Sequence, residues 1–282
     1  IPVWRKNDFD LVVCLGDRYE MFAACAGAVP FNVKLAHIHG GEETLGAIDN
    51  AFRHSITHMA DVHFTAAEPY RQRVISLVWS DRNVYNNGSL SIDNLRNLSL
   101  YTIQEFKSRF DIDLSKPSIL ITFHPETVSF ERNETYVNEL VGALAEITNY
   151  QFIITMPNAD TMGDLIRSRL NDFIRSNDRA FGVESFGTVG YLSCMKHCSF
   201  MLGNTSSGFI EASFFPKYVI NLGDRQKGRI VTPNIKDCPI EKNHIIGAID
   251  FFSKFVMPDE VSIYGKGDAA DKIVNILKTT YD

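Results

Sequence analysis

Several patterns that would assign this chain to a membrane or to a secreted scaffold are missing. No apolar run in the 282 residues approaches the roughly 20 residues that a membrane-spanning helix needs. The cysteines number five, which is odd, and form no Cys-x-x-Cys pair. There is no signal-peptide pattern, internal repeat or low-complexity tract. The simplest interpretation is a cytoplasmic protein with reduced thiols.

The usual signatures of cofactor and metal enzymes are also missing. The chain has no Gly-x-Gly-x-x-Gly motif to suggest a nicotinamide and no His-Glu-x-x-His motif to suggest zinc. Its net charge of -6 and pI near 5.8 argue against nucleic acid or an anionic membrane surface as the main partner. We therefore expect no cofactor, no nucleic acid and no membrane partner.

What is present is a large apolar content in a regular alternation. Hydrophobic residues make up 45% of the chain, enough for two domains of ordinary size. Strand-like runs alternate with helical patterns throughout, which predicts an α/β fold with parallel sheets. The predicted strands span 10–15, 33–38, 62–65, 82–86, 118–123, 151–156, 199–202 and 218–222. The predicted helices span 18–28, 47–60, 67–79, 131–148, 161–177, 187–196, 207–215, 241–255 and 267–280.

A polar stretch rich in turn residues, 87–117, predicts the boundary between the domains. It ends in Pro117, immediately before a fresh apolar strand. We place the domains at 1–98 and 99–282, and leave open whether the last helix packs back on the first domain.

The most informative segment is 37–58, HIHGGEETLGAIDNAFRHSITH. Asp49, Arg53 and Thr57 are spaced four apart, so they share one helix face. A carboxylate, a guanidinium and several imidazoles behind a double glycine indicate proton transfer beside an anion. A polar helix N-terminus with solvated charges is the alternative. The density of ionisable groups favours a site, with glycines that would let a ligand approach the backbone.

A second candidate follows the apolar run of DLVVCLGDRYE, at 10–20. An unbroken hydrophobic run fits a buried strand of a parallel sheet, and ligands bind outside the carboxyl ends of such strands. Asp17 lies at this end, where chemistry is expected. A helix N-cap is an equally good interpretation of the same residue.

In the second half, GNTSSGFIEA follows the apolar run SFML and precedes a predicted helix. Hydroxyls and free backbone N–H groups at such a turn suit a diphosphate, although Ser and Thr also cap helices widely. A carboxylate just beyond the turn can accept hydrogen bonds from ribose hydroxyls. The candidate ligand-binding residues of this segment are Thr205, Ser206, Ser207, Gly208 and Glu211.

His124 follows the run LITF and precedes Pro125, which fixes the backbone. It is a candidate phosphate donor or acid to a leaving group; the alternative is a structural hydrogen bond. Arg225 and Arg229 offer a clamp for phosphate, or are simply solvated. His54 and His58 have the spacing of a helical metal pair, but Arg53 beside them disfavours a cation, so we expect no metal site.

Six motifs taken together resemble a known family. LGDRYE, HIHGGE, GAIDNAFRHSITHMA, FHPET, GNTSSGFIEA and INLGDRQKGR follow one another in its order and cover nearly the whole chain. They are similar to the UDP-N-acetylglucosamine 2-epimerase family, most of all its hydrolysing branch in sialic-acid-type sugar synthesis. The resemblance implies two Rossmann-like domains facing across a cleft (GT-B-like) in a homodimer or homotetramer. The family's N-terminal Gly-Thr-Arg phosphate loop is absent, so the first domain is expected to be N-terminally incomplete.

The resemblance also implies a mechanism. Removal of the proton at C2 and loss of UDP from C1 give a 2-acetamidoglycal, which water converts to N-acetylmannosamine. Many family members have Glu where this chain has His39, so either His39 or Glu42 is the C2 base, and we prefer a carboxylate. In the resemblance, Thr205 and Ser206 contact the UDP phosphates and Glu211 contacts the ribose. The implied catalytic residues are Asp17, His39, Glu42, Asp49, Arg53 and His124.

Three alternatives to this function stay open. Relatives that act on UDP-2,4-diacetamido-2,4,6-trideoxyglucose, on the route to legionaminic acid, have similar motifs. A GT-B glycosyltransferase would share the phosphate-binding loop and the ribose carboxylate, but it would not need Asp17, Asp49 and Arg53. A UDP-sugar binder without turnover is the non-enzymatic alternative.

Overall fold

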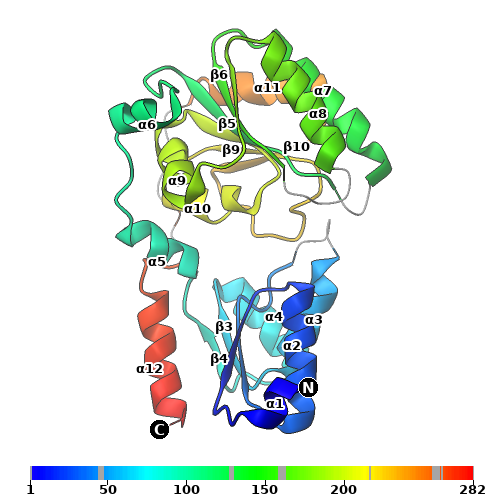
Figure 1. Cartoon of the computed structure of the whole chain (residues 1–282), viewed down its shortest axis with the longest axis vertical. Coiled ribbons are helices and arrows are strands. Elements are labelled where there is room, and N and C mark those ends of the chain that lie inside the picture. The colour runs from blue at the N-terminus through cyan, green and yellow to red at the C-terminus, as the bar shows by residue number, and fades with distance from the viewer. Residues whose placement is uncertain are drawn as a thin grey trace. The chain divides into compact units, whose positions relative to one another are not determined.

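Two parallel β-sheets, each covered by helices, organise the chain (Figure 1). The computed structural model describes residues 2–43, 48–126, 130–157, 163–215, 217–255, 261 and 263–281. The chain separates into unit 1, Ile1–Arg96 with Ser262–Asp282, and unit 2, Asn97–Val261. This division lies beside the position proposed from the sequence, 98/99. The C-terminal segment belongs to unit 1.

Unit 1 contains a four-stranded sheet in the order β1-β2-β3-β4, with every pairing parallel. All four strands predicted for this part of the chain are present. The strands are β1 (Val12–Leu15), β2 (Leu35–Ile38), β3 (Val62–Thr65) and β4 (Val84–Asn86). The helices are α1 (Pro2–Lys6), α2 (Tyr19–Ala28), η1 (Val29–Phe31), α3 (Asp49–Met59), α4 (Glu68–Val78), α5 (Leu90–Asn97) and α12 (Ala269–Tyr281).

The two faces of the unit 1 sheet have different covers. One face packs against α2 and α3 through a cluster that includes Cys14, Cys25 and Ile56. The other face packs against α12, whose Ile273 is buried with strand residues such as Phe64. Asp93 on α5 accepts hydrogen bonds from two backbone N–H groups in the first turn of α12, at 3.0 and 2.6 Å. This contact satisfies otherwise unpaired donors and fixes where α12 begins.

Unit 2 contains a six-stranded parallel sheet in the order β10-β9-β8-β5-β6-β7. None of the helices in the described part of the chain is both long and apolar enough to cross a membrane. The strands are β5 (Ser118–Thr122), β6 (Gln151–Thr155), β7 (Ala180–Val183), β8 (Phe200–Gly203), β9 (Val219–Leu222) and β10 (Ile235–Cys238). The helices are α6 (Ile103–Phe110), η2 (Phe130–Arg132), α7 (Asn133–Glu146), α8 (Gly163–Ser176), α9 (Gly187–His197), η3 (Ser206–Gly208), α10 (Glu211–Phe214) and α11 (Lys242–Phe252).

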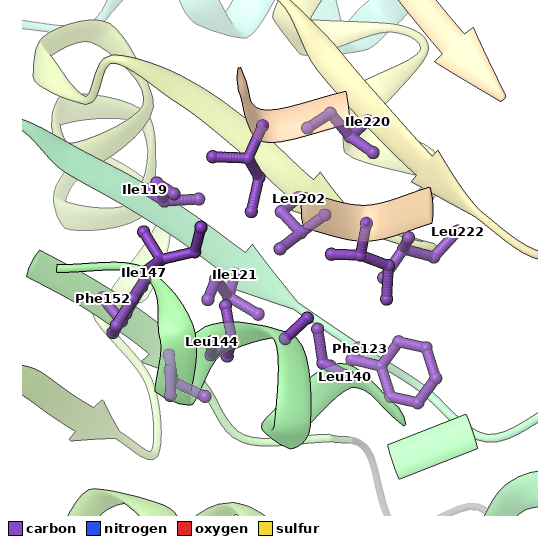
Figure 2. Packing of buried hydrophobic residues seen from close by; sticks show 14 of the residues in the cluster. Ile119, Ile121, Phe123, Leu140, Leu144, Ile147, Phe152, Leu202, Ile220 and Leu222 are labelled. Atoms are coloured by element: carbon purple, nitrogen blue, oxygen red, sulfur yellow. The ribbon is translucent and has the colours of Figure 1, made fainter. Parts of the chain in front are cut away.

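The main core of unit 2 lies between the sheet and helices α7, α8 and α11 (Figure 2). Alternate strand residues such as Ile119 and Ile121 meet Leu140 and Leu144 of α7 there. These side chains are fully buried, and each contributes roughly 1.5–3 kcal/mol by leaving water. This packing holds the central strands in place. It therefore also positions the polar residues at their carboxyl ends.

The prediction missed several elements. Helices α5 and α6 lie in the stretch 87–117, which the sequence indicated only as a polar linker. At α6, Thr102 and Glu105 form a reciprocal capping box that a polar composition conceals. Strands β7 and β10 were not predicted either. They are four-residue edge strands with partly exposed side chains, so they present no apolar run.

Candidate active site

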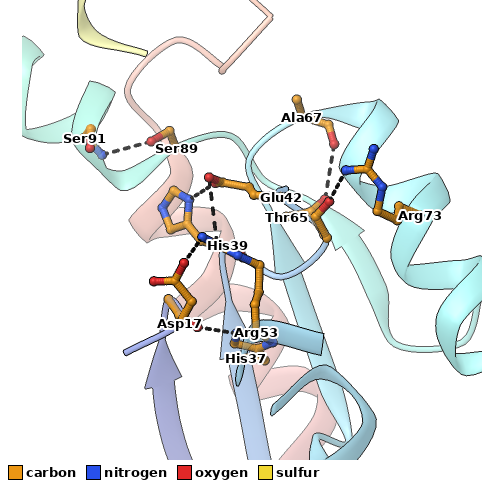
Figure 3. A network of polar contacts seen from close by, with 12 residues as sticks. Asp17, His37, His39, Glu42, Arg53, Thr65, Ala67, Arg73, Ser89 and Ser91 are labelled. Atoms are coloured by element: carbon orange, nitrogen blue, oxygen red, sulfur yellow. Dashed lines mark hydrogen bonds and ion pairs between the residues drawn. The ribbon is translucent and has the colours of Figure 1, made fainter. Parts of the chain in front are cut away.

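In unit 1, a buried arginine connects three segments of the chain (Figure 3). Arg53 on α3 is 4% exposed and donates to the carbonyl of His39, over 2.7 Å. Its second nitrogen pairs with Asp17, and its first lies 3.9 Å from a carboxylate oxygen of Glu42. The guanidinium thus fixes the loops after β1 and β2 against α3. Removing one partner from a buried ion pair typically costs about 3–5 kcal/mol.

His39 and Glu42 form a carboxylate–imidazole pair beside this arginine. His39 Nδ1 lies 2.7 Å from Glu42 Oε1, and the side chains are 14% and 4% exposed, respectively. His39 also has a left-handed backbone (φ 65°), which non-glycine residues adopt only when the surroundings impose it. Two backbone contacts impose it here, from His39 N to the Phe64 carbonyl and from Arg53 to the His39 carbonyl. The imidazole is therefore held in one orientation, with Nε2 as its remaining nitrogen.

His37, two residues earlier, has a structural role. Its Nε2 lies 2.9 Å from the carbonyl of Gly16, and its Nδ1 lies 3.1 Å from Thr57 Oγ1. Because a carbonyl only accepts, Nε2 carries the proton. Burial lowers the pKa of His37 to about 4, so the ring is neutral near pH 7. It connects the loop before Asp17 to α3.

Packing within unit 1 requires glycine at positions 40 and 41. We expected Gly40 and Gly41 to let a ligand approach the backbone. A Cβ on Gly41 would lie 2.3 Å from the Tyr70 carbonyl oxygen, and one on Gly40 would lie 3.0 Å from His37 Nδ1. The glycines let this loop pack against α4 and His37, so they form the site indirectly by shaping the loop.

The structure also bears on three other candidates in unit 1. Asp17 is not the cap of α2, because Arg18 occupies the N-cap position; Asp17 pairs with Arg53 instead. Asp49 is the first residue of α3 and is partly exposed. Within the described ranges, no three His, Cys, Asp or Glu side chains converge as a metal site would require, and His54 lies near Glu43 at 3.9 Å.

In unit 2, the polar residues at the ends of β5 and β8 are tied together by one amide side chain. The backbone N–H of His124 donates to Asn204 Oδ1 over 2.7 Å, and Asn204 Nδ2 returns a hydrogen bond to the His124 carbonyl over 2.8 Å. Asn204 is fully buried. Asn204 was not among the predicted site residues, although a polar residue directly after a buried strand is a signal for one.

A group of hydroxyls surrounds a cavity of about 410 Å³ at the same edge of the sheet. Ser207 Oγ lies 2.6 Å from Tyr191 Oη and 3.2 Å from Thr205 Oγ1. Burial raises the pKa of Tyr191 to about 12, so its phenol stays protonated. The cavity is lined by Thr122, His124, Thr155, Met156, Glu184, Ser185, Phe186, Gly187, Thr188, Tyr191, Thr205 and Ser207.

The segment after Asn204 differs from the expected helix start. The predicted helix 207–215 is a 3₁₀ turn, η3, followed by the four-residue α10, which begins at Glu211. Gly208 is explained by packing, since a Cβ there would lie 2.9 Å from Val219 Cγ1. Any ligand therefore meets hydroxyls such as that of the exposed Ser206, rather than the N-terminus of a long helix.

The loop 223–229 brings the predicted arginines into this network. Arg225 and Gln226 donate to the Asn204 carbonyl, over 3.2 and 2.8 Å. Arg229 donates to Gln226 Oε1 over 2.7 Å, so it is connected to the Asn204 carbonyl through Gln226. Gln226 is buried and was not predicted. Both arginines are partly buried rather than simply solvated.

Comparison with known proteins identifies the family of the chain. A sequence model of the UDP-N-acetylglucosamine 2-epimerase family matches residues 1–278. The chain belongs to this family. The family resemblance expected from the six motifs is confirmed, and the protein is an enzyme of the 2-epimerase type.

Curated relatives include a polysialic acid biosynthesis protein and hydrolysing 2-epimerases. The chain is 37% identical over 280 residues to the Escherichia coli polysialic acid biosynthesis protein P7, covering 98% of this chain and 71% of that protein. It is 38% identical over 232 residues to a GDP/UDP-N,N'-diacetylbacillosamine 2-epimerase (hydrolyzing) of Campylobacter jejuni, covering 82% of this chain and 60% of that protein.

Solved 2-epimerase structures share the fold. The Neisseria meningitidis UDP-GlcNAc 2-epimerase bound to UDP-GlcNAc has a TM-score of 0.83 at 21% identity, with 99% of this chain and 78% of that chain covered. The Methanocaldococcus jannaschii enzyme in complex with UDP-GlcNAc and UDP has a TM-score of 0.82 at 18% identity, with the same coverage. The predicted α/β class with two Rossmann-like, GT-B-like domains is confirmed.

Proposed function

We propose that this 2-epimerase is of the hydrolysing type and converts UDP-N-acetylglucosamine to UDP and free N-acetylmannosamine. The observation that carries the proposal is the pair of His39 and Glu42 beside the buried Arg53. An imidazole oriented by a carboxylate suits the abstraction of a carbon-bound proton. The hydroxyl-lined cavity of unit 2 suits the nucleotide.

In the first step, His39 Nε2 takes the proton from C2 of the sugar. The C–H electron pair forms the C1–C2 double bond, and the C1–O bond breaks with its pair going to UDP. Water then adds its hydroxyl to C1 and a proton to C2, with inversion at C2. The sequence favoured a carboxylate base, but Glu42 is almost enclosed and already accepts from His39. We therefore assign proton abstraction to His39 and stabilisation of its imidazolium form to Glu42.

Asp17 and Arg53 position the pair of His39 and Glu42. One terminal nitrogen of Arg53 pairs with Asp17, and the other donates to the His39 carbonyl and faces Glu42. Arg53 thereby positions the base, and Asp17 positions Arg53. We assign to Asp49, at the start of α3, the return of a proton to C2.

The nucleotide half of the proposal uses unit 2. Thr205, Ser206 and Ser207 offer hydroxyl donors to the diphosphate, and Arg225 offers a cation that matches phosphate geometry. Glu211 is assigned to the ribose hydroxyls. The cavity walled by Phe186 and Tyr191 has the size and mixed polarity that suit a nucleobase. His124, whose backbone Asn204 fixes, is assigned to the departing UDP as donor or acid.

A second substrate has specific support. Relatives at 38% and 30% identity, from Campylobacter jejuni and Legionella pneumophila, are named as hydrolysing N,N'-diacetylbacillosamine 2-epimerases. A UDP-2,4-diacetamido-2,4,6-trideoxyglucose would undergo the same bond changes at C1 and C2. The two substrates differ only at C4 and C6, which the proposed chemistry does not touch.

One experiment separates these possibilities. The protein is incubated with each UDP-sugar in deuterated water, and UDP release and the deuterium content of the sugar at C2 are measured. A hydrolysing 2-epimerase releases UDP and places deuterium at C2, and the faster substrate identifies the sugar. A glycosyltransferase without acceptor would leave C2 undeuterated, and binding without UDP release would end the proposal.

Matched variants test the assignment of the base. His39→Gln should reduce UDP release by about 10²–10⁴-fold. The control is His244→Gln, an exposed histidine on α11 of unit 2, which should leave turnover unchanged. Near-normal turnover in His39→Gln would transfer the role to Glu42.

A further inference from the structure

Two cysteines that have no role in the proposed catalysis meet in the core of unit 1. Cys14 on β1 and Cys25 on α2 place their sulfur atoms 3.1 Å apart. Both side chains are buried, at 0% and 1% exposed, in the cluster that joins the sheet to α2 and α3. A disulfide has an S–S distance of about 2.05 Å, so a shift of about 1 Å would bring the sulfurs to bonding distance.

We infer that Cys14 and Cys25 are a redox modification site, which a low-molecular-weight disulfide oxidises to an intramolecular disulfide that displaces Asp17. The consequence for activity rests on the proposed function. Formation of the bond does not.

The chemistry starts at Cys25. The hydrogen bond between the two thiols lowers the pKa of Cys25 and raises that of Cys14, so Cys25 is the first nucleophile. Its thiolate attacks one sulfur of the small disulfide and releases one thiolate, leaving a mixed disulfide. Cys25 in the mixed disulfide no longer raises the pKa of Cys14 by its hydrogen bond and charge, so Cys14 loses its proton. The Cys14 thiolate then attacks the Cys25 sulfur and releases the second small thiolate. Two protein thiols lose two protons and two electrons, and the small disulfide becomes two thiols.

The other cysteines provide an internal contrast. Burial raises the pKa of Cys198 and of Cys238, each to about 11, and raises that of Cys194 as well. A thiol with a raised pKa forms little thiolate at neutral pH, and the thiolate is the reactive species. Oxidation should therefore concentrate at the pair in unit 1.

The location of the pair explains why the bond would matter. The two cysteines are 11 positions apart, and the segment between them contains Gly16 and Asp17. The Gly16 carbonyl is held by His37, and Asp17 is paired with Arg53. If the disulfide draws β1 and α2 together, the turn that joins them, which contains Gly16 and Asp17, must change its conformation. A misplacement of about 1 Å near a catalytic group can reduce rate by about 10²-fold.

The test for the bond needs no turnover. The full chain is incubated with oxidised glutathione and is then digested with trypsin. Because both sulfurs are buried, the incubation must be long enough for local opening of the structure. Cleavage after Lys6, Arg18 and Lys34 puts Cys14 on peptide 7–18 and Cys25 on peptide 19–34. Mass spectrometry should find these two peptides joined with the loss of two hydrogens. Absence of this species at every glutathione ratio overturns the inference.

The test for displacement uses two independent measurements. UDP release should fall by about 10²-fold on oxidation and return with dithiothreitol. Cys25→Ala should resist oxidation, whereas Cys238→Ala should respond like wild type. Amide hydrogen exchange at residues 15–19 should change in parallel. A reduced enzyme without activity would refute only the proposed function, whereas a cross-linked enzyme with unchanged exchange would refute displacement of Asp17.

Discussion

Two neutral histidines should make unit 1 sensitive to acid. His37 and His63 are neighbours across β2 and β3, and both are buried. Burial lowers the pKa of each to about 4, from an ordinary value of 6.5. At a pH between 4 and 6.5, the two imidazoles bind protons in the unfolded chain but stay neutral in the folded chain. Their contribution to stability is therefore complete above pH 6.5 and is lost as the pH falls toward 4.

The size of the effect follows from this interval. Between pH 7 and pH 5, the unfolded imidazole gains about 0.7 of a proton, while the folded one gains about 0.1. Proton linkage converts this difference to about 2 kcal/mol for each histidine, or about 4 kcal/mol for the two. A loss of this size is a large fraction of the stability of an ordinary domain, which is about 5–15 kcal/mol.

The chain itself supplies the probe. Its two tryptophans, Trp4 and Trp79, are both in unit 1. Trp4 packs against Phe9, so its fluorescence during urea unfolding reports on that unit, whereas Trp79 is 93% exposed and gives a nearly constant background. Wild type should lose about 4 kcal/mol of unfolding free energy between pH 7 and pH 5. The double variant His37→Gln with His63→Gln should lose far less. His54, whose pKa burial also lowers, leaves a residual slope.

A double variant with the wild-type pH dependence would refute this account. It would mean that the acid sensitivity arises from carboxylates and not from buried imidazoles. His244→Gln is the control, since its side chain is exposed, and it should follow wild type.

Three further predictions concern the proposed active site. Glu211→Ala should weaken UDP binding by roughly 1.5–3 kcal/mol in calorimetry, the scale of hydrogen bonds to a charged group, and unchanged affinity would remove Glu211 from the ribose site. Glu126 accepts from the backbone N–H of Asp224 over 2.9 Å, so Glu126→Ala should release the loop 223–229 and weaken UDP binding about tenfold, while Glu126→Gln should retain most of the affinity. Turnover should survive EDTA, with no stoichiometric metal in plasma emission analysis. One zinc per chain, with activity lost on chelation and restored by zinc, would overturn that prediction.

The sequence predicted much of the fold because the buried strands are continuous apolar runs. The central strand β5 is fully buried and was read directly from the run at 118–123. Edge strands such as β10 are only four residues long, and the two middle residues of β10, Lys236 and Asp237, are exposed, so this strand gave no apolar signal. Polar helices such as α6 were missed because their stability depends on a cap and not on apolar content.

The candidate site was predicted by residue type but not by connectivity. Asp17 and Arg53 were both chosen from the sequence, 36 positions apart, yet nothing in the sequence shows that they pair. Asn204 and Gln226 were missed because they act on backbone carbonyls and amides, which any segment can offer. The packing of Gly40 and Gly41 against the rest of unit 1 was not predicted. The absence of a Cβ indicates a close approach, but only coordinates show what approaches.

The place of helix α12 affects the order in which the chain can fold as it is made. Its residues 269–281 cover one face of the unit 1 sheet, and Asp93 caps its first turn. Domains generally fold as units while the ribosome still holds the later residues. Unit 2, from residue 97 to 261, is synthesised in full before α12 emerges. Apolar residues such as Ala36 and Phe64, which pack with α12, remain exposed to solvent during that interval. The unit that is synthesised first is therefore completed last, and a nascent chain stalled before residue 269 should attract chaperones at its N-terminal sheet.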